Sequence, residues 1–325
     1  MPPTRASRLI AHAGARRACG KPIAGARVTA AIRLLAAALL ILTVAGCRHR
    51  HRAHPAPAAS AAAAAPKFEP FRFQISADGD HYQIDGLIAL ANPPGRLPAL
   101  LVLNGGGGDA HKCIRDTEHF TALGMRVACI SMPGFGKSSG PNRFVGPPAV
   151  DAARHALDLL AARADVDPAR LAVWGVADGA VAAGLLMDSD SRPRVVILQS
   201  GAYDMLKFWP EAPLGAKLSI LRRVWPSKRA LKERSVVEHL PRRLDCAILI
   251  LHGEQDRRMP VAQAEQLAQA LSERGAHVET YYFPKGTHDL GTRVDIPIGG
   301  FLRENLIAQP AASAPAAAPA PAPSE

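Results

Sequence analysis

The sequence predicts an α/β protein with a mostly parallel, doubly wound sheet and a small cap inserted beyond the ends of its strands. Between residues 68 and 308, short apolar runs rich in β-forming residues alternate with segments of helical spacing. Several runs, among them LLVL, VVIL and AILIL, are continuously apolar, as expected of strands that helices cover on both faces. A segment of about 240 residues is long enough for one large core of this kind.

The order of the elements supports this prediction. Strands are expected at 71–76, 82–90, 99–103, 126–131, 171–174, 195–199, 247–251 and 278–283. Helices are expected at 148–164, 178–188, 261–275 and 297–308. Two antiparallel strands followed by repeated strand–helix units give a doubly wound sheet, in which ligands bind beyond the carboxyl ends of the strands.

The segment 202–245 interrupts this alternation. It combines aromatic residues and prolines, such as Trp209, Pro213 and Trp225, with many basic residues. We interpret it as a cap over the carboxyl edge of the sheet. The alternative is a helical excursion on the surface that does not contact a ligand.

The amino-terminal 47 residues have the pattern of a signal peptide. Leu34–Gly46 is an uncharged apolar run of 13 residues behind a basic stretch, which suits the apolar core of such a peptide and is short for a membrane span. The run ends in Val44-Ala45-Gly46-Cys47, which resembles the lipobox of bacterial lipoproteins. This resemblance implies a diacylated Cys47, a membrane anchor, and a place in the bacterial cell envelope facing the periplasm. An ordinary secretory signal with an accidental Cys47, and a start at Val28, remain open alternatives.

The charge of the chain is concentrated ahead of the predicted domain. The whole chain carries 39 Lys and Arg against 28 Asp and Glu, and ten of these basic residues lie in 1–54 without any acidic residue. The remaining residues hold 29 basic and 28 acidic side chains. A nearly neutral body lacks the phosphate-neutralising charge on which nucleic-acid binding depends, so we exclude that class of partner.

The segments that flank the body have biased compositions. Residues 48–67 are rich in Ala, Pro, His and Arg and are expected to form a linker, while the Ala/Pro-rich 309–325 is expected to be a disordered tail. His49, His51 and His54 alternate with arginines, which repel a cation, so we predict no metal there, and no cofactor elsewhere. Within the body, three cysteines allow one disulfide and one free thiol, and no spacing matches a zinc site.

A strand–turn–helix motif marks the candidate functional site. Residues 170–179 read RLAVWGVADG, a buried strand that continues into Gly-Val-Ala-Asp-Gly and a helix. This is the context of the nucleophile elbow G-x-S-x-G, in which a serine attacks a carbonyl carbon. Ala177 occupies the central position, and its methyl group cannot act as a nucleophile. A second G-x-S-x-G match around Ser138 lies in a loop followed by Pro141, so we do not expect a nucleophile there.

Potential partners of the elbow follow other strands. Asp256 lies in the loop after the strand at 247–251, and His288 follows the last strand. Gly105 and Gly106 follow the strand at 99–103, where bare backbone N–H groups could bind an oxyanion. The order of elbow, acid and histidine is the one that α/β-hydrolases use.

Residues 68–308 therefore resemble the α/β-hydrolase family, closest to its dienelactone-hydrolase and prolyl-oligopeptidase-like members. The similarity extends to PGFGKSSG at 133–140, DVDPAR at 165–170 and LHGEQD at 251–256. The resemblance implies that Asp256 is the acid and His288 the base, that the backbone N–H of Asp178 lines the oxyanion hole, and that small esters, lactones or peptides are the ligands.

The chain departs from the family at three positions. Ala177 replaces the nucleophile, Asn104 stands where family members often have histidine, and Asp178 places a carboxylate beside the oxyanion hole. An acidic residue in the first turn of a helix is also favoured by the helix dipole.

The missing hydroxyl excludes acyl transfer through residue 177 and leaves three hypotheses. The domain is a binding or scaffold relative that does not catalyse. Alternatively, Asp256 and His288 activate water or abstract a substrate proton directly. In the third hypothesis, a nucleophile at another position, Asp178 or Ser200, forms the covalent intermediate.

Overall fold

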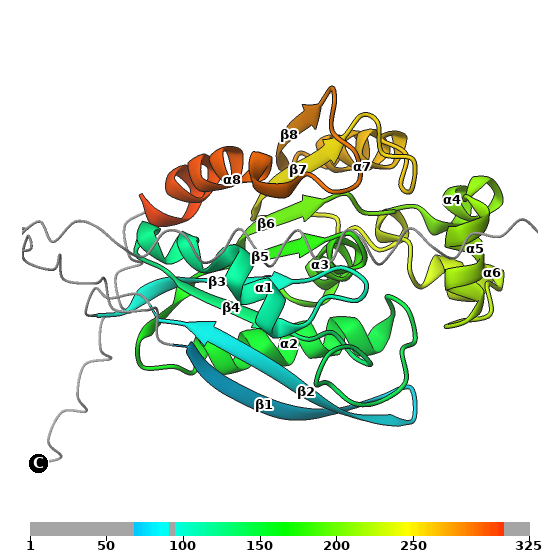
Figure 1. Cartoon of the computed structure of the whole chain (residues 1–325). Helices are drawn as coiled ribbons and strands as arrows, with labels where there is room; N and C mark the ends of the chain where they lie inside the picture. The colour runs from blue at the N-terminus through cyan, green and yellow to red at the C-terminus, as the bar shows by residue number, and fades with distance from the viewer. Residues whose placement is uncertain (1–67, 91–94, 309–325) are drawn as a thin grey trace, which may run out of the picture. The chain divides into compact units, whose positions relative to one another are not determined.

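The computed structural model describes residues 68–90 and 95–308 (Figure 1). The predicted signal peptide with Cys47, the predicted linker 48–67 and the predicted tail 309–325 lie outside these described residues. In the described part of the chain, no helix is both long and apolar enough to span a membrane.

A single sheet of eight strands organises the described residues. Its strand order is β1-β2-β4-β3-β5-β6-β7-β8. The strands are β1 (Phe68–Ala77), β2 (Asp80–Ala89), β3 (Leu97–Leu103), β4 (Arg126–Ile130), β5 (Val166–Val176), β6 (Pro193–Gln199), β7 (Ala247–Gly253) and β8 (His277–Phe283). Strand β2 pairs antiparallel with both β1 and β4, and all other neighbours pair parallel. The predicted mostly parallel, doubly wound sheet is confirmed.

Helices cover both faces of the sheet, as Figure 1 shows. One apolar cluster joins the strands to α2 (Pro147–Ala161), α3 (Asp178–Ser189) and α7 (Ala262–Ser272). The other joins the strands to α1 (Ala110–Thr117) and α8 (Asp295–Leu302). The central strands are buried on both faces as a result, which explains their continuously apolar sequences.

Two local differences from the prediction have physical reasons. Strand β5 begins at Val166 rather than at residue 171, because Val166 pairs with Leu97 before the register shifts around Pro168. Helix α1 was not predicted. It is only eight residues long, begins after the capping carboxylate of Asp109, and is polar overall, so it resembles a loop in composition although one side of it is buried.

The segment between β6 and β7 forms the cap. It contains α4 (Met205–Glu211), α5 (Leu214–Leu221) and α6 (Lys228–Lys232), which lie beyond the carboxyl ends of β5 and β6 (Figure 1). The short η2 (Val236–Glu238) follows, and its Val236 is buried in the main apolar cluster against α3. Met205, Phe208, Ile220 and Leu231 form a separate small apolar cluster, and Phe144 of the body packs against it. The cap is therefore held in place by its own core and by contact with the body.

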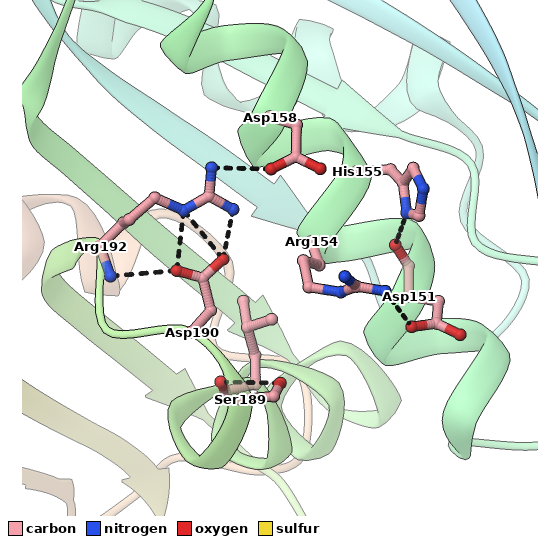
Figure 2. Close-up of polar contacts among 8 residues, drawn as sticks. Asp151, Arg154, His155, Asp158, Ser189, Asp190 and Arg192 are labelled. Atoms are coloured by element: carbon pink, nitrogen blue, oxygen red, sulfur yellow. Dashed lines mark hydrogen bonds and ion pairs between the residues drawn. The ribbon is translucent and has the colours of Figure 1, made fainter.

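An ion-pair network joins α2 to the end of α3, next to the amino end of β6. Figure 2 shows Arg192, which donates to Asp158 of α2 and to Asp190 at the end of α3, with Nη1–Oδ1 and Nε–Oδ1 distances of 2.8 and 2.9 Å. Burial disfavours the charged form of Asp190, but the bonds from Arg192 outweigh this effect and lower the pKa of the carboxyl. The network orients the loop that leads into β6 and does not line the cavity beneath the cap.

A disulfide fastens α1 to the sheet. Cys113 of α1 and Cys129 of β4 are bonded across 16 residues of chain, and both are buried. Cys246, the third cysteine of the body, is free and half-buried. Burial raises the pKa of its thiol to about 11, which suppresses its reactivity at neutral pH.

We expect the Cys113→Ala/Cys129→Ala variant to lose about 3 kcal/mol of unfolding free energy, because a loop of this length is no longer closed in the unfolded chain. Urea unfolding under oxidising conditions measures the loss, with Cys246→Ala as the control. Addition of a reductant should lower the stability of the unchanged protein and leave the double variant unaffected. Equal sensitivity of the two proteins would contradict this role for the disulfide.

Candidate active site

The turn between β5 and α3 holds Ala177 in a strained conformation. Its φ is 51° and its ψ is −114°, a region that non-glycine residues rarely occupy. The Ala177 N–H donates to Gln199 O at 2.8 Å, and its carbonyl accepts from Ala180 N–H at 3.0 Å. Both ends of the residue are therefore fixed, and its side chain projects from the apex of the turn.

The flanking glycines make this turn possible. A Cβ on Gly175 would lie 2.2 Å from Gly179 O, and a Cβ on Gly179 would lie 2.0 Å from Leu103 O. Neither contact is possible, so only glycine fits where α3 approaches the sheet this closely. The elbow therefore retains the backbone geometry that presents a nucleophile, while its apex carries a methyl group.

Asp256 and His288 meet beside the elbow. His288 Nδ1 lies 2.7 Å from Asp256 Oδ2. The other carboxylate oxygen accepts hydrogen bonds from the backbone N–H groups of Arg258 and Met259 at 2.8 and 3.0 Å. Because Asp256 is held by its own loop, it can fix the orientation of the imidazole ring.

The carboxylate of Asp178 turns toward the cap. It forms an ion pair with Arg223, with an Nη1–Oδ2 distance of 3.1 Å. Arg223 is itself held by Ser219, whose carbonyl accepts from Nε at 3.0 Å, and its guanidinium carbon lies 4.7 Å from the centroid of the Phe144 ring. The charge beside the elbow is therefore balanced by a cation from the cap.

A cavity of about 410 Å³ lies between these groups and the cap. Ala177, Asp178 and His288 line it from the body, together with Gly106. The cap contributes residues of α5 and the following turn, including Ala216, Ser219, Ile220 and Arg223. The cap thus lines the cavity directly, which favours the interpretation of 202–245 as a cap over the carboxyl edge of the sheet.

Known proteins are similar to this chain in sequence and in fold. Residues 149–297 match the prolyl oligopeptidase family. The protein bem46 of Schizosaccharomyces pombe is 28% identical over 244 residues, which cover 72% of this chain and 77% of bem46. The uncharacterized peptidase YuxL of Bacillus subtilis is 27% identical over 128 residues, which cover 38% of this chain and only 19% of YuxL.

A solved structure decides the fold. The acylaminoacyl peptidase of Pyrococcus horikoshii superposes with a TM-score of 0.61 at 16% identity, covering 74% of this chain and 42% of the peptidase. This domain has the α/β-hydrolase fold. The predicted fold resemblance is confirmed. The chain spans less than half of the peptidase and about a fifth of YuxL, so the activities of those longer proteins do not transfer to it directly.

Two of the three residues predicted to form the oxyanion hole, Gly106 and Asp178, line the cavity. The N–H of Gly105 instead donates to Asn104 Oδ1 at 3.1 Å. The assignment of Gly105 to the oxyanion hole therefore stays a prediction, in which a ligand oxygen would replace the Asn104 side chain as the acceptor of its N–H. Gly106 and Asp178 are likewise candidates for binding an oxyanion.

Neither Ser200, the serine proposed as a shifted nucleophile, nor Ser138, where no nucleophile was expected, lies in the cavity lining of the described domain. Ser200 is fully buried with a φ of 54°, and its Oγ has no hydrogen-bond partner within the described ranges. Ser138 Oγ donates to Ser131 O at 2.7 Å and accepts from Asp85 N–H at 2.9 Å, so it links two segments of the body. Of the proposed shifted nucleophiles, only Asp178 reaches the cavity.

Two residues of the site were missed by sequence reasoning. His252 is fully buried in β7, and its Nε2 lies 2.8 Å from Met259 O and 3.5 Å from Asp256 Oδ2. The sequence could have indicated His252, because it lies four residues before Asp256 in the LHGEQD motif. No such indication exists for Arg223, because its pairing with Asp178 connects distant segments of the chain.

The environment of Asp256 favours its charged form. Burial alone would raise the pKa of this carboxyl, but hydrogen bonds from His252, His288 and Met259 N–H outweigh burial and hold the pKa well below its usual range. Arginines likewise lower the pKa of Asp165 and Asp190 away from the cavity. A lowered pKa therefore does not by itself distinguish Asp256 from the other two carboxylates. Asp256 differs from them in its histidine partner, His288, which lines the cavity.

We expect Asp256→Asn to cost about 1–3 kcal/mol of unfolding free energy at pH 7, since buried donors lose a charged acceptor. A depressed native pKa stabilises the fold above the unfolded-state pKa of about 4, and this contribution is lost as the pH falls toward the native value. Urea unfolding between neutral and acidic pH should therefore show the two proteins converging in stability below about pH 4. Asp289→Asn, at an exposed carboxylate in the histidine loop, is the control. A difference that does not change with pH would contradict the electrostatic account.

Proposed function

We propose that this protein is an envelope lipoprotein whose α/β-hydrolase domain binds a small ligand without forming an acyl intermediate at residue 177. The observation that supports this most directly is the methyl group of Ala177 at the apex of an otherwise retained elbow. A triad without its nucleophile loses most of its acceleration, and only the contribution of the oxyanion hole and of binding remains. Retention of the surrounding cavity supports a role in binding.

The cavity suggests the class of ligand. Its volume of about 410 Å³ suits a small ester, a lactone or a short peptide, and its walls combine apolar groups with His288 and Arg223. Similarity to an acylaminoacyl peptidase and to the prolyl oligopeptidase family supports a ligand with an acyl or amide group. Gly106 and Asp178 would hold its carbonyl oxygen.

A second candidate function is hydrolysis that does not use a serine. It is favoured by the bond between Asp256 and His288 Nδ1, which directs the remaining ring nitrogen, Nε2, to accept a proton. In this proposal, His288 takes a proton from water as the water oxygen attacks the ligand carbonyl, and then returns the proton to the leaving group. Such a reaction forms no covalent intermediate with the protein.

One variant distinguishes these proposals. We expect the unchanged protein to leave short-chain activated esters intact, and Ala177→Ser to hydrolyse them, because the new hydroxyl projects from the apex beside His288. Adding His288→Ala to Ala177→Ser should lower the rate by about 100-fold or more, the usual contribution of a general base. Release of the chromogenic alcohol measures each rate.

The other outcomes are equally informative. Turnover by the unchanged protein that disappears in His288→Ala would favour the serine-free hydrolase over the binding role. A folded but inactive Ala177→Ser protein would contradict the assigned geometry of the site. A binding role also requires that a ligand raise the melting temperature of the unchanged protein, which a panel of small esters, lactones and dipeptides can test.

Two observations support a place in the cell envelope. The segment ending in Cys47 resembles a lipobox. The Cys113–Cys129 disulfide is typical of proteins that fold in oxidising compartments such as the periplasm. Together they support a domain that faces the periplasm and is attached to the membrane through lipid on Cys47.

We expect Cys47→Ser to move the protein from the membrane fraction to the soluble fraction after a high-salt wash, because it removes the residue that would carry the lipid. The wash screens peripheral electrostatic contacts. Immunoblots of the two fractions measure the change, and Cys246→Ser, at the free cysteine of the domain, is the control. A Cys47→Ser protein that stays in the washed membranes would refute the lipoprotein assignment.

A further inference from the structure

Helix α5 of the cap exposes a stripe of large apolar side chains. Leu214, Leu218 and Leu221 are 72%, 46% and 41% exposed, and Trp225, just after the helix, is 77% exposed. Spacings of four and three residues place the three leucines along one side of α5, since each residue of an α-helix turns by about 100°, and Trp225 follows four residues after Leu221, beyond the end of the helix. We call these four residues the cap stripe. Four of the large hydrophobic residues exposed in the described domain thus lie together on one short segment.

The opposite side of α5 belongs to the cavity. Ala216, Ser219 and Ile220 line it, together with Arg223. The helix is therefore the wall between the cavity and the surface, and its inward side is already used. The cap stripe faces outward and does not belong to the small apolar core of the cap.

Basic residues surround the cap stripe. The segment 202–245 holds ten Lys and Arg but only five Asp and Glu, whereas the body as a whole is nearly neutral. Arg222 and Lys228 are exposed beside the stripe and form no ion pair with any residue of the described domain. Lys217, also on α5, directs its ammonium group to Pro210 O at 2.8 Å and keeps its charge.

We propose that the cap stripe docks onto a lipid bilayer that contains anionic headgroups. An apolar stripe flanked by Lys and Arg is the composition of helices that lie in a membrane interface, and Trp is enriched at the level of the headgroups. A second copy of the chain is a poorer occupant, because two caps with an excess of basic residues would repel one another. Docking would place the wall of the cavity at the membrane surface, independently of any lipid on Cys47.

The position of the three tryptophans gives a direct test. Trp174 is buried in the core, Trp209 is half-buried, and Trp225 is exposed on the cap stripe. The segment before the domain contains no tryptophan, so membrane binding by that segment does not bring a tryptophan into lipid. Quenching of tryptophan fluorescence by brominated acyl chains therefore reports contact of the domain itself with the bilayer.

The experiment uses the full-length Cys47→Ser protein and vesicles of brominated phosphatidylcholine with or without phosphatidylglycerol. We expect quenching only when phosphatidylglycerol is present, and loss of quenching in Trp225→Phe. Leu218→Glu/Leu221→Glu should also reduce the quenching to the level of phosphatidylcholine vesicles, since charged side chains replace the apolar contact. Circular dichroism verifies that each variant is folded.

The matched control is Leu159→Glu/Ile296→Glu, which alters two exposed apolar residues on α2 and α8, outside the cap. It should retain the full quenching. Unchanged quenching in Leu218→Glu/Leu221→Glu, or quenching that does not depend on phosphatidylglycerol, would overturn the proposal. Sedimentation in the absence of lipid measures whether the protein forms a dimer. A dimer that forms with the natural cap stripe and is lost in Leu218→Glu/Leu221→Glu would instead assign the cap stripe to contact with a second copy of the chain. Each of these measurements uses a protein that lacks Cys47 and contains no added ligand. Its outcome therefore does not depend on the proposed lipid anchor or on the proposed binding function.

Discussion

The close approach of α3 to the sheet is the constraint on which the site depends. Gly179 lies against the carbonyl of Leu103, and Gly175 lies against Gly179, so no side chain fits at either position. The chain must therefore turn abruptly between β5 and α3, which places Ala177 at a φ of 51°. Strained backbone of this kind persists only where the surrounding structure enforces it. Here the enforcing contacts are those of the hydrolase fold, and they hold whatever side chain occupies the apex.

Electrostatics around the cavity is arranged by contacts between segments far apart in the chain. His252, His288 and two backbone N–H groups of its own loop hold Asp256 in its charged form. Asp178 is compensated by Arg223, which comes from the cap. Charge beside the elbow is thus balanced before any ligand enters. An oxyanion or carbonyl would meet the donors of Gly106 and Asp178 without facing an unpaired carboxylate.

Helix α5 of the cap lies between the cavity and the molecular surface. One side of α5 lines the cavity while the other carries the cap stripe, so one short helix contacts both environments. Its attachment to the body through Phe144 and Arg223 means that a contact on the outer side would act on the cavity wall directly.

The order of strands and helices could be predicted because it depends on local patterns. Continuously apolar runs indicated the buried strands, and the glycines at 175 and 179 indicated the elbow. The same sequence determined that residue 177 is alanine, which excludes a serine mechanism there by chemistry alone. Tertiary structure decided which groups meet: His288 with Asp256, and Arg223 with Asp178. It also decided that the three leucines of α5 face outward while Ile220 of the same helix faces the cavity. These facts depend on contacts between residues distant in the chain, which no local pattern encodes.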